Sequence, residues 1–173
     1  MTRADKPLAL TLGDPAGIGP DITLLAFEAR RAASTPPFVL LGDPGVLAER
    51  AGALGLAVRI EPIADIAAAS SVFADALPVL PLQVARTVVA GRADPANAAI
   101  VQQSIERSVA LAQSGAASAV VTNPISKATL ASAGFGFPGH TEFLAALSGR
   151  EASDAVMMLV GEGLKVVPVT IHL

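Results

Sequence analysis

Short apolar runs that alternate with helical patterns constrain the fold of this chain more than any other feature of its sequence. The runs are apolar throughout rather than alternating, which is typical of parallel strands buried on both faces by helices. The sequence therefore predicts an α/β layered fold. The expected strands are residues 8–12, 38–41, 119–122, 156–160 and 165–171, and the last two are expected to form a hairpin around Gly161-Glu162-Gly163.

Capping residues mark where the intervening helices are expected to begin and end. Asp, Thr and Pro favour the first positions of a helix, and Gly favours the position just after its end. The starts are predicted at Pro20, Asp43-Pro44, Asp94-Pro95 and Thr141, and the ends at Gly55, Gly115 and Gly149. The helix that opens at Asp94-Pro95 is the clearest, because apolar residues recur along one face of it.

The length and hydrophobic content allow one large or two small domains. With 173 residues and 52% hydrophobic content, the chain can bury a substantial core. Residues 60–95 are less regular, so a domain boundary is expected there. No apolar run approaches the roughly 20 residues of a membrane-spanning helix, and the amino terminus lacks the apolar stretch of a secretory signal. The cytoplasm is the expected location.

Charge and composition narrow the classes of partner. The net charge is −3, no basic run is present and aromatic residues make up 3% of the chain. Binding of nucleic acid through basic or stacking side chains is therefore disfavoured. Because the chain has no cysteine, any metal ion must be held by His, Asp and Glu. Small-molecule chemistry and simple scaffolding remain as classes of function.

The segment GDPAGIGPD places three glycines and Asp14 between a strand and a helix. Backbone amides in such a turn can hold an anion. The spacing matches neither the dinucleotide-binding nor the Walker pattern. A tight turn required by the fold is the favoured interpretation, and contact with a ligand is the alternative.

A second segment, VTNPISKATLASAGFGFPGHTEFLAAL, holds most of the polar candidates. Asn123 follows a strand, where open α/β sheets collect ligands. Lys127 is expected in the first turn of a helix, a position that disfavours a cation unless an anionic ligand faces it; a solvated surface lysine is the alternative. His140 follows a turn, and its neutral ring could donate or accept a hydrogen bond. Thr141 beside it is by default a helix cap.

His172 follows the apolar stretch VVPVTI and is the other histidine of the chain. It would project from the carboxyl end of a strand, and neutral imidazole is a common metal ligand. A single histidine is not a metal site, because zinc needs three or four ligands. Asp14 and Glu142 are candidate carboxylate helpers, although turn and cap roles are the favoured explanations.

Three motifs together resemble one family. LTLGDPAGIGPDI, VTNPISKATLASAGFGFPGHTEFLAAL and VMMLV followed by VVPVTIHL are similar to the amino-terminal half of 4-hydroxythreonine-4-phosphate dehydrogenases. The resemblance covers essentially the whole chain. It implies a three-layer α/β/α fold like that of isocitrate and isopropylmalate dehydrogenases. The full-length family has two domains around a cleft, and these residues, 1–173, would form the amino-terminal part, with the carboxyl-terminal half absent.

The resemblance also implies an activity and a site. The family oxidises 4-phosphooxy-L-threonine with NAD or NADP and a divalent metal ion, zinc or its substitutes magnesium and cobalt, in pyridoxal phosphate biosynthesis. By motif position, His140 and Thr141 match substrate-binding residues and His172 matches a metal ligand. Asp14, Asn123 and Lys127 are further candidates for contact with substrate or cofactor. Family members are homodimers whose site is shared across the interface, so this chain alone is expected to be inactive and weakly stable.

Three other hypotheses stay open. Relatives on the same scaffold oxidise threonate or erythronate phosphates, or a dihydrodiol dicarboxylate, and they share the histidines. A protein of a different class, a non-catalytic binding or oligomerisation module, would keep the fold without the chemistry. A phosphate-binding protein that uses the turn at residues 13–19 is a third hypothesis.

Overall fold

The computed structural model describes residues 6–168. The chain divides into two compact units, Met1–Gly136 and Phe137–Leu173. The boundary between them follows Gly136, whereas the sequence places one within residues 60–95. The reason is that residues 60–95 supply two strands, β3 and β4, to the sheet of the first unit and so cannot be separated from it.

The first unit is built on a five-stranded parallel sheet. The strand order is β3-β4-β2-β1-β5. Neighbouring strands pair in parallel throughout; Leu8 of β1, for example, lies opposite Phe38 of β2. The strands are β1 (Leu8–Thr11), β2 (Phe38–Gly42), β3 (Ile60–Pro62), β4 (Leu77–Pro81) and β5 (Val120–Val121). The predicted strands at residues 8–12, 38–41 and 119–122 are therefore confirmed to within one or two residues at each end.

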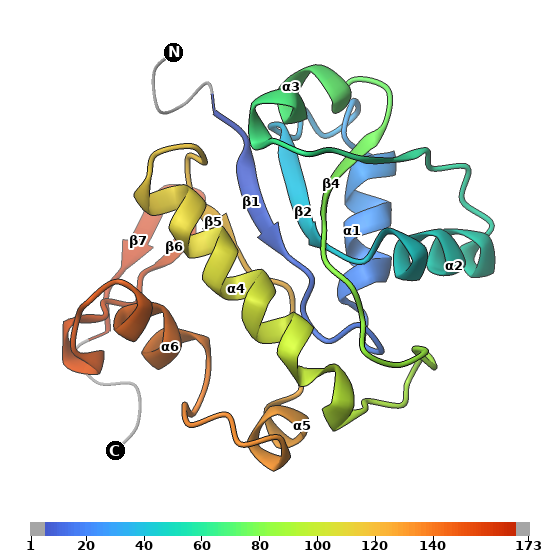
Figure 1. The fold of residues 1–173 in the computed structure, drawn as a ribbon. Helices are drawn as coiled ribbons and strands as arrows, with labels where there is room; N and C mark the ends of the chain where they lie inside the picture. Colours follow the sequence, from blue (N-terminus) through green and yellow to red (C-terminus); the bar gives the residue numbers. More distant parts are fainter. Residues whose placement is uncertain (1–5, 169–173) are drawn as a thin grey trace. The chain divides into compact units, whose positions relative to one another are not determined.

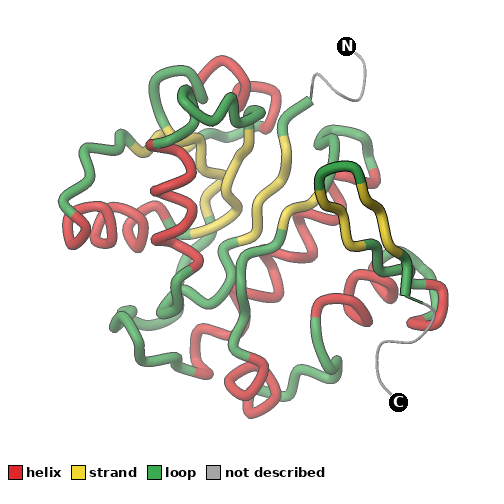
Figure 2. Tube along the Cα trace, turned by 180° about the vertical axis from the view of Figure 1, so that it is seen from behind, coloured by secondary structure: helices red, strands yellow, loops and turns green. Residues whose placement is uncertain are grey.

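Helices cover both faces of this sheet and complete three layers. Helix α4 lies across one face and α1 lies against the opposite face (Figures 1 and 2). The helices of this unit are α1 (Gly19–Glu28), α2 (Pro44–Leu54), α3 (Ala69–Val72), α4 (Ala98–Gln113) and α5 (Lys127–Ser132), with short 3-10 turns at Ile66–Ala68 and Pro95–Asn97. The predicted three-layer α/β architecture is confirmed for this unit.

The core lies between these layers. Every residue of β2 is buried, as expected for the central strand of a sheet that is covered on both faces. Phe27, Phe38 and Phe73 form a cluster in which the Phe73 ring meets the other two edge to face, at 5.4 and 4.8 Å between centroids. Burial of each such side chain stabilises the fold by roughly 1.5–3 kcal/mol.

The predicted caps of α2 are confirmed. Asp43 is the N-cap, and its Oδ1 accepts hydrogen bonds from the amides of Gly45 (2.8 Å) and Val46 (3.3 Å). Its Oδ2 accepts a third, from the amide of Val84 at 3.0 Å. Gly55 ends the helix in the left-handed conformation, at φ +67°. One carboxylate therefore starts α2 and also holds the loop that follows β4.

The second unit holds one helix and one hairpin within its described residues. Helix α6 (His140–Leu147) is followed by a 3-10 turn at Ala152–Asp154. The strands β6 (Leu159–Gly161) and β7 (Leu164–Val166) pair in an antiparallel hairpin, with Leu159 opposite Val166. The predicted hairpin is confirmed with shorter strands, although its expected end, residues 169–171, lies outside the described residues.

One predicted cap is wrong. Thr141 was expected to precede α6, but the helix begins at His140 and its N-cap is Gly139. Thr141 therefore lies inside the first turn. Gly139 is in the extended conformation, at φ −177°, and the helix begins two residues earlier than a threonine cap at residue 141 requires.

The helices of residues 6–168 include none that combines the length and the apolar character needed to cross a lipid bilayer.

Candidate functional site

The strand order reverses at β1, and this reversal creates the candidate site. Strand β1 pairs with β2 on one side and with β5 on the other. The segments that leave the carboxyl ends of β1 and β5 therefore diverge from neighbouring positions, which is where open α/β sheets bind ligands. The amide of Asp14, after β1, donates to the carbonyl oxygen of Pro124, after β5, at 2.9 Å. The structure thus brings together two of the segments singled out from the sequence.

Asn123 ties these segments to each other and to α1. Only 4% of its surface is exposed. Its backbone amide donates to Thr11 Oγ1 at 3.1 Å, and its side-chain Nδ2 donates to the Thr11 carbonyl oxygen at 2.9 Å and to Thr23 Oγ1 at 2.8 Å. Thr23 in turn donates to the Gly19 carbonyl oxygen at the start of α1. Both protons of the Asn123 amide are used, so only Oδ1 is left to contact a ligand, and Oδ1 can only accept.

Gly13 and Gly19 of the turn are required by this packing. Gly13 has φ +71°, and a Cβ there would lie 2.5 Å from the Pro124 carbonyl oxygen. A Cβ on Gly19 would lie 2.5 Å from the Leu12 carbonyl oxygen. Both distances are far below van der Waals contact. A larger residue at position 13 would force the segments after β1 and β5 apart, and one at position 19 would force the start of α1 away from the end of β1. This geometry supports the interpretation of the segment as a tight turn.

Several amides of the turn are used within the protein. Besides the amide of Asp14, that of Ala16 donates to Asp14 Oδ1 and that of Gly17 to the Asp14 carbonyl oxygen, each at 2.9 Å. Amides committed in this way do not point at an anion. This part of the turn therefore lacks the free donors of a phosphate-binding loop, which weakens the hypothesis of a phosphate-binding protein at residues 13–19.

Asp14 has two roles in this geometry. It organises its own turn through Oδ1, in the manner of an Asx turn. The residue is 9% exposed, and Oδ2 accepts no hydrogen bond from the described residues. One oxygen is thus structural and the other is available to a donor.

Lys127 occupies the position predicted for it. It is the first residue of α5, whose N-cap Ser126 accepts a hydrogen bond from the amide of Thr129. The lysine is exposed, and no ion pair to it is found among the described residues.

A residue that the sequence did not single out, Ser104 of α4, supports the site from behind. It is fully buried. Its Oγ accepts from the Leu12 amide at 2.9 Å and donates to the Leu41 carbonyl oxygen at 2.6 Å, so it fixes the ends of β1 and β2. A serine among apolar residues on the buried face of α4 was the only sequence signal for this role.

The remaining candidates lie in the second unit or outside the described residues. His140 is half-buried and Thr141 is exposed, and they are the first two residues of α6. His172 lies outside the described residues. Within residues 6–168, no three His, Asp or Glu side chains form a group that could hold a metal ion.

Comparison with known proteins identifies the family that this chain resembles. The model of the family described as "Pyridoxal phosphate biosynthetic protein PdxA" matches residues 33–173. A protein of Methylorubrum extorquens named 4-hydroxythreonine-4-phosphate dehydrogenase is 54% identical over 99% of this chain and 50% of its own length. One of the same name from Xanthobacter autotrophicus is 49% identical over 98% of this chain and 49% of its own length.

Solved structures agree with the sequence relatives. A 4-hydroxythreonine-4-phosphate dehydrogenase from Burkholderia phymatum superposes with a TM-score of 0.87 at 29% identity, covering 97% of this chain and 50% of that one. The enzyme of the same name from Klebsiella pneumoniae gives 0.82 at 32% identity, covering 94% and 50%. The chain spans about half the length of the curated relatives it matches. With a family model matched over most of its residues, this chain belongs to the pyridoxal phosphate biosynthetic protein PdxA family.

Proposed function

We propose that this chain is the amino-terminal part of a dehydrogenase that oxidises 4-phosphooxy-L-threonine to 2-amino-3-oxo-4-phosphooxybutanoate. The observation that carries the proposal is the 54% identity, over 99% of the chain, to a relative named 4-hydroxythreonine-4-phosphate dehydrogenase. The product is a β-keto acid, which loses carbon dioxide to give 3-amino-2-oxopropyl phosphate. The reaction serves pyridoxal phosphate biosynthesis, in the cytoplasm.

The oxidation removes a hydride from the carbon that bears the hydroxyl group and a proton from its oxygen. The proposed cofactors are NAD or NADP and a divalent ion, zinc or its substitutes magnesium and cobalt. When bound, the nicotinamide accepts the hydride and the ion lowers the pKa of the substrate hydroxyl. The described residues do not hold a metal ion by themselves. His172 is proposed as one ligand, with the others supplied outside these 173 residues.

The described residues then have the task of binding and orienting the substrate. The ammonium group of Lys127, exposed at the start of α5, would attract the phosphate or carboxylate of the substrate. Asn123 Oδ1 and Asp14 Oδ2 can only accept, so they would meet its ammonium or hydroxyl group. His140 and Thr141 are proposed to hydrogen-bond the substrate from α6. Holding a flexible substrate in this way lowers the entropic part of the barrier.

The proposed assembly is a homodimer whose site is completed across the interface. It follows that this chain alone binds substrate weakly at best and does not turn it over. NAD(P)H formation by the purified 173-residue chain would contradict this expectation. Binding of the phosphorylated substrate without turnover, even after the missing half is supplied, would favour the non-catalytic module instead.

The metal assignment is tested by replacing the residue equivalent to His172 with alanine in the full-length Methylorubrum extorquens relative. We expect loss of bound zinc, measured by elemental analysis, and loss of metal-dependent turnover with an unchanged circular dichroism spectrum. Full activity at full metal content would show that His172 is not a ligand.

The substrate assignment is tested at two positions of the same relative. Replacing the residue equivalent to His140 with alanine should raise KM about tenfold or more, because a positioning contact is lost. Replacing the residue equivalent to Lys127 with methionine should raise KM for phosphorylated substrates specifically, because the charge that attracts the phosphate is lost. Assay of 4-phosphooxy-L-threonine beside threonate and erythronate phosphates decides the substrate; preference for either of the latter pair would correct this part of the proposal.

A further inference from the structure

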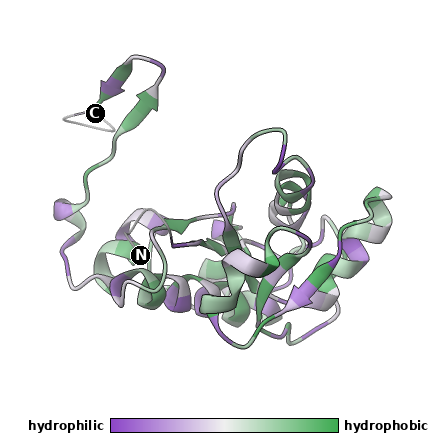
Figure 3. Ribbon diagram, turned by 90° about the horizontal axis from the view of Figure 1, so that it is seen from above, coloured by the Kyte–Doolittle hydropathy of each residue, from purple (hydrophilic) through white to green (hydrophobic). Residues whose placement is uncertain are grey.

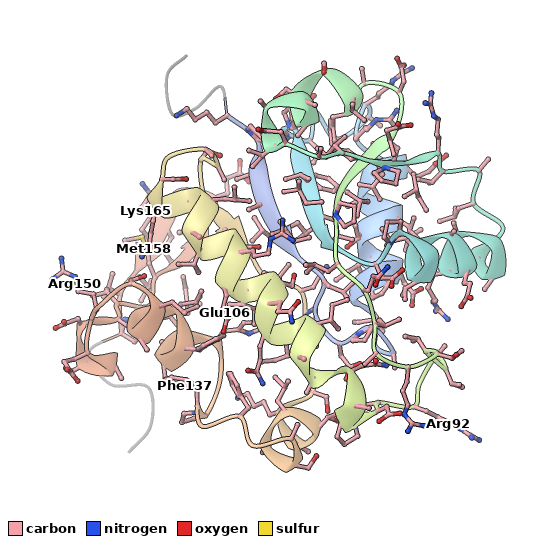
Figure 4. The ribbon with its side chains drawn as sticks, in the orientation of Figure 1. Arg92, Glu106, Phe137, Arg150, Met158 and Lys165 are labelled. Atoms are coloured by element: carbon pink, nitrogen blue, oxygen red, sulfur yellow. The ribbon has the colours of Figure 1, made fainter. Side chains whose placement is uncertain are left out.

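The hairpin β6–β7 exposes apolar side chains on both of its faces. The register places Leu159, Gly161, Leu164 and Val166 on one face, because residues opposite each other in an antiparallel pair share a face. Val160 and Lys165 lie on the other, together with Met158 and Val167 just beyond the paired residues. Exposure reaches 59% at Leu159, 65% at Leu164 and 68% at Val160. Figure 3 colours much of this hairpin as hydrophobic, and Met158 and Lys165 are labelled in Figure 4.

A strand that is apolar on both faces belongs inside a sheet that is covered on both faces. A two-stranded hairpin is marginally stable in water by itself, and both of its outer edges can accept further strands. Contiguous exposed apolar surface of this kind marks an interaction site. The hairpin therefore requires an occupant.

We infer that the occupant is the half of the family chain that has no counterpart in these 173 residues, which adds strands to the edges of β6–β7 and covers both faces. The relatives carry about as much chain again as is matched here: this chain covers 50% of the Methylorubrum extorquens protein and 50% of the Burkholderia phymatum structure. A second copy of this chain is the competing occupant. It would bring another hairpin with the same unpaired edges and would leave the other half of the relatives without a docking face.

The first unit carries an apolar surface of the same kind, which the same occupant would cover. A groove of about 320 Å³ lies on the α1 side of the sheet, beside the edge strand β5. Its walls come from α1, β1, β2 and β5 and the chain before β2, and they are almost wholly apolar; Ile22 and Val121 are exposed there at 40% and 42%. A groove without charged side chains is suited to packing of protein rather than to an anionic substrate.

The inference predicts that the two halves assemble when supplied separately. The 173-residue chain is mixed with the carboxyl-terminal half of the Methylorubrum extorquens relative, and hydrogen exchange is followed at residues 156–167. We expect binding and at least about tenfold slower exchange of these amides. Leu164→Lys, on one face, and Val160→Lys, on the other, should each weaken binding about tenfold or more, because a charge would be buried. Leu54→Lys on α2, equally apolar and 41% exposed, is the matched control and should bind normally.

Three outcomes overturn the inference. Exchange that is unaffected by the added half, or variants that bind like the Leu54→Lys control, would show that the hairpin is not the docking face. Self-association of this chain that protects residues 156–167 would identify a second copy as the occupant. If the separate half does not fold, the equivalent amides are measured in the full-length relative, where fast exchange would contradict burial. Because none of these readouts is turnover, failure of the proposed enzyme activity would not affect them.

Discussion

Strands β2 and β7 both carry large apolar residues, but their surroundings are opposite. In β2, Val39, Leu40 and Leu41 are completely buried between neighbouring strands and helices on both faces. In β7, Leu164 and Val166 are 65% and 42% exposed, and the only neighbour of the strand among the described residues is β6. The apolar sequence of a strand therefore indicates that its side chains require burial, and the neighbouring elements determine whether they are buried.

The two units differ in the same way throughout. The first has a sheet covered on both faces, and its turns are tied by buried hydrogen bonds such as those of Asn123 and Ser104. The second has a short helix and a hairpin with few buried residues. We therefore expect the first unit to unfold cooperatively and the second to exchange its amides rapidly until it is covered.

The largest expected difference in stability is between leucine-to-alanine substitutions in the two strands. Leu40→Ala should lower the free energy of unfolding of the first unit by about 2–5 kcal/mol, because it leaves a cavity in the core. Leu164→Ala should change the stability of this chain by less than about 0.5 kcal/mol. Urea unfolding followed by circular dichroism checks both. A cost for Leu164→Ala that approaches that of Leu40→Ala would show that the hairpin is already packed.

Alanine at two glycines of similar conformation separates backbone strain from crowding. Gly13 and Gly163 have φ +71° and +74°, but a Cβ meets the Pro124 carbonyl oxygen only at Gly13, and nothing lies within 4 Å at Gly163. Gly13→Ala should cost about 2–4 kcal/mol from strain and collision together. Gly163→Ala should cost about 1 kcal/mol, from φ alone, read from hydrogen exchange of the hairpin. Equal costs would mean that the close approach at Gly13 relaxes freely.

Substitutions of Asn123 distinguish a structural role of this side chain from a role in ligand contact. Asn123→Ala should lower the stability of the first unit by about 2 kcal/mol in the absence of any ligand, because Thr11 and Thr23 lose its hydrogen bonds. Asn123→Asp keeps the shape but removes both N–H donors, so it should cost nearly as much. Gln103→Ala on the exposed side of α4 is the control, and thermal melts give the comparison. Stability unchanged in both Asn123 variants would leave ligand binding as its main role.

The smallest expected effects concern capping carboxylates. Asp43→Ala should cost about 1 kcal/mol, since it removes the N-cap of α2 and the bond to the Val84 amide. Asp154, in the second unit, accepts one long, exposed bond of 3.3 Å from the Glu151 amide. Asp154→Ala should stay within about 0.5 kcal/mol. Chemical denaturation of the first variant and local hydrogen exchange of the second provide the measurements.

Local signals predicted much of the fold. Asp43-Pro44 and Gly55 delimit α2 as expected, and Pro20 lies in the first turn of α1. These signals work because caps and prolines act through atoms only a few residues away. The prediction of Thr141 as a cap was wrong because the capping ability of a threonine does not determine at which residue the chain enters the helix.

The site was predicted only in part. The sequence indicated Asn123 and Asp14 because each follows a strand, but it could not show that the amide protons of Asn123 are used by Thr11 and Thr23. It also gave Ser104 no role, because a serine on a helix is usually solvated. Contacts between residues about 90 to 110 positions apart depend on the strand order, which local sequence does not encode.

By itself, the sequence determined the apolar runs, the helix limits and the family of this protein, because these depend on residue identity and spacing. Only the tertiary structure decided that β5 returns beside β1, that Gly13 and Asn123 come into contact, and that the hairpin stays uncovered in this chain. The physical reason is that burial and hydrogen-bond partners are properties of pairs of segments, and a pair is set by topology rather than by either segment alone.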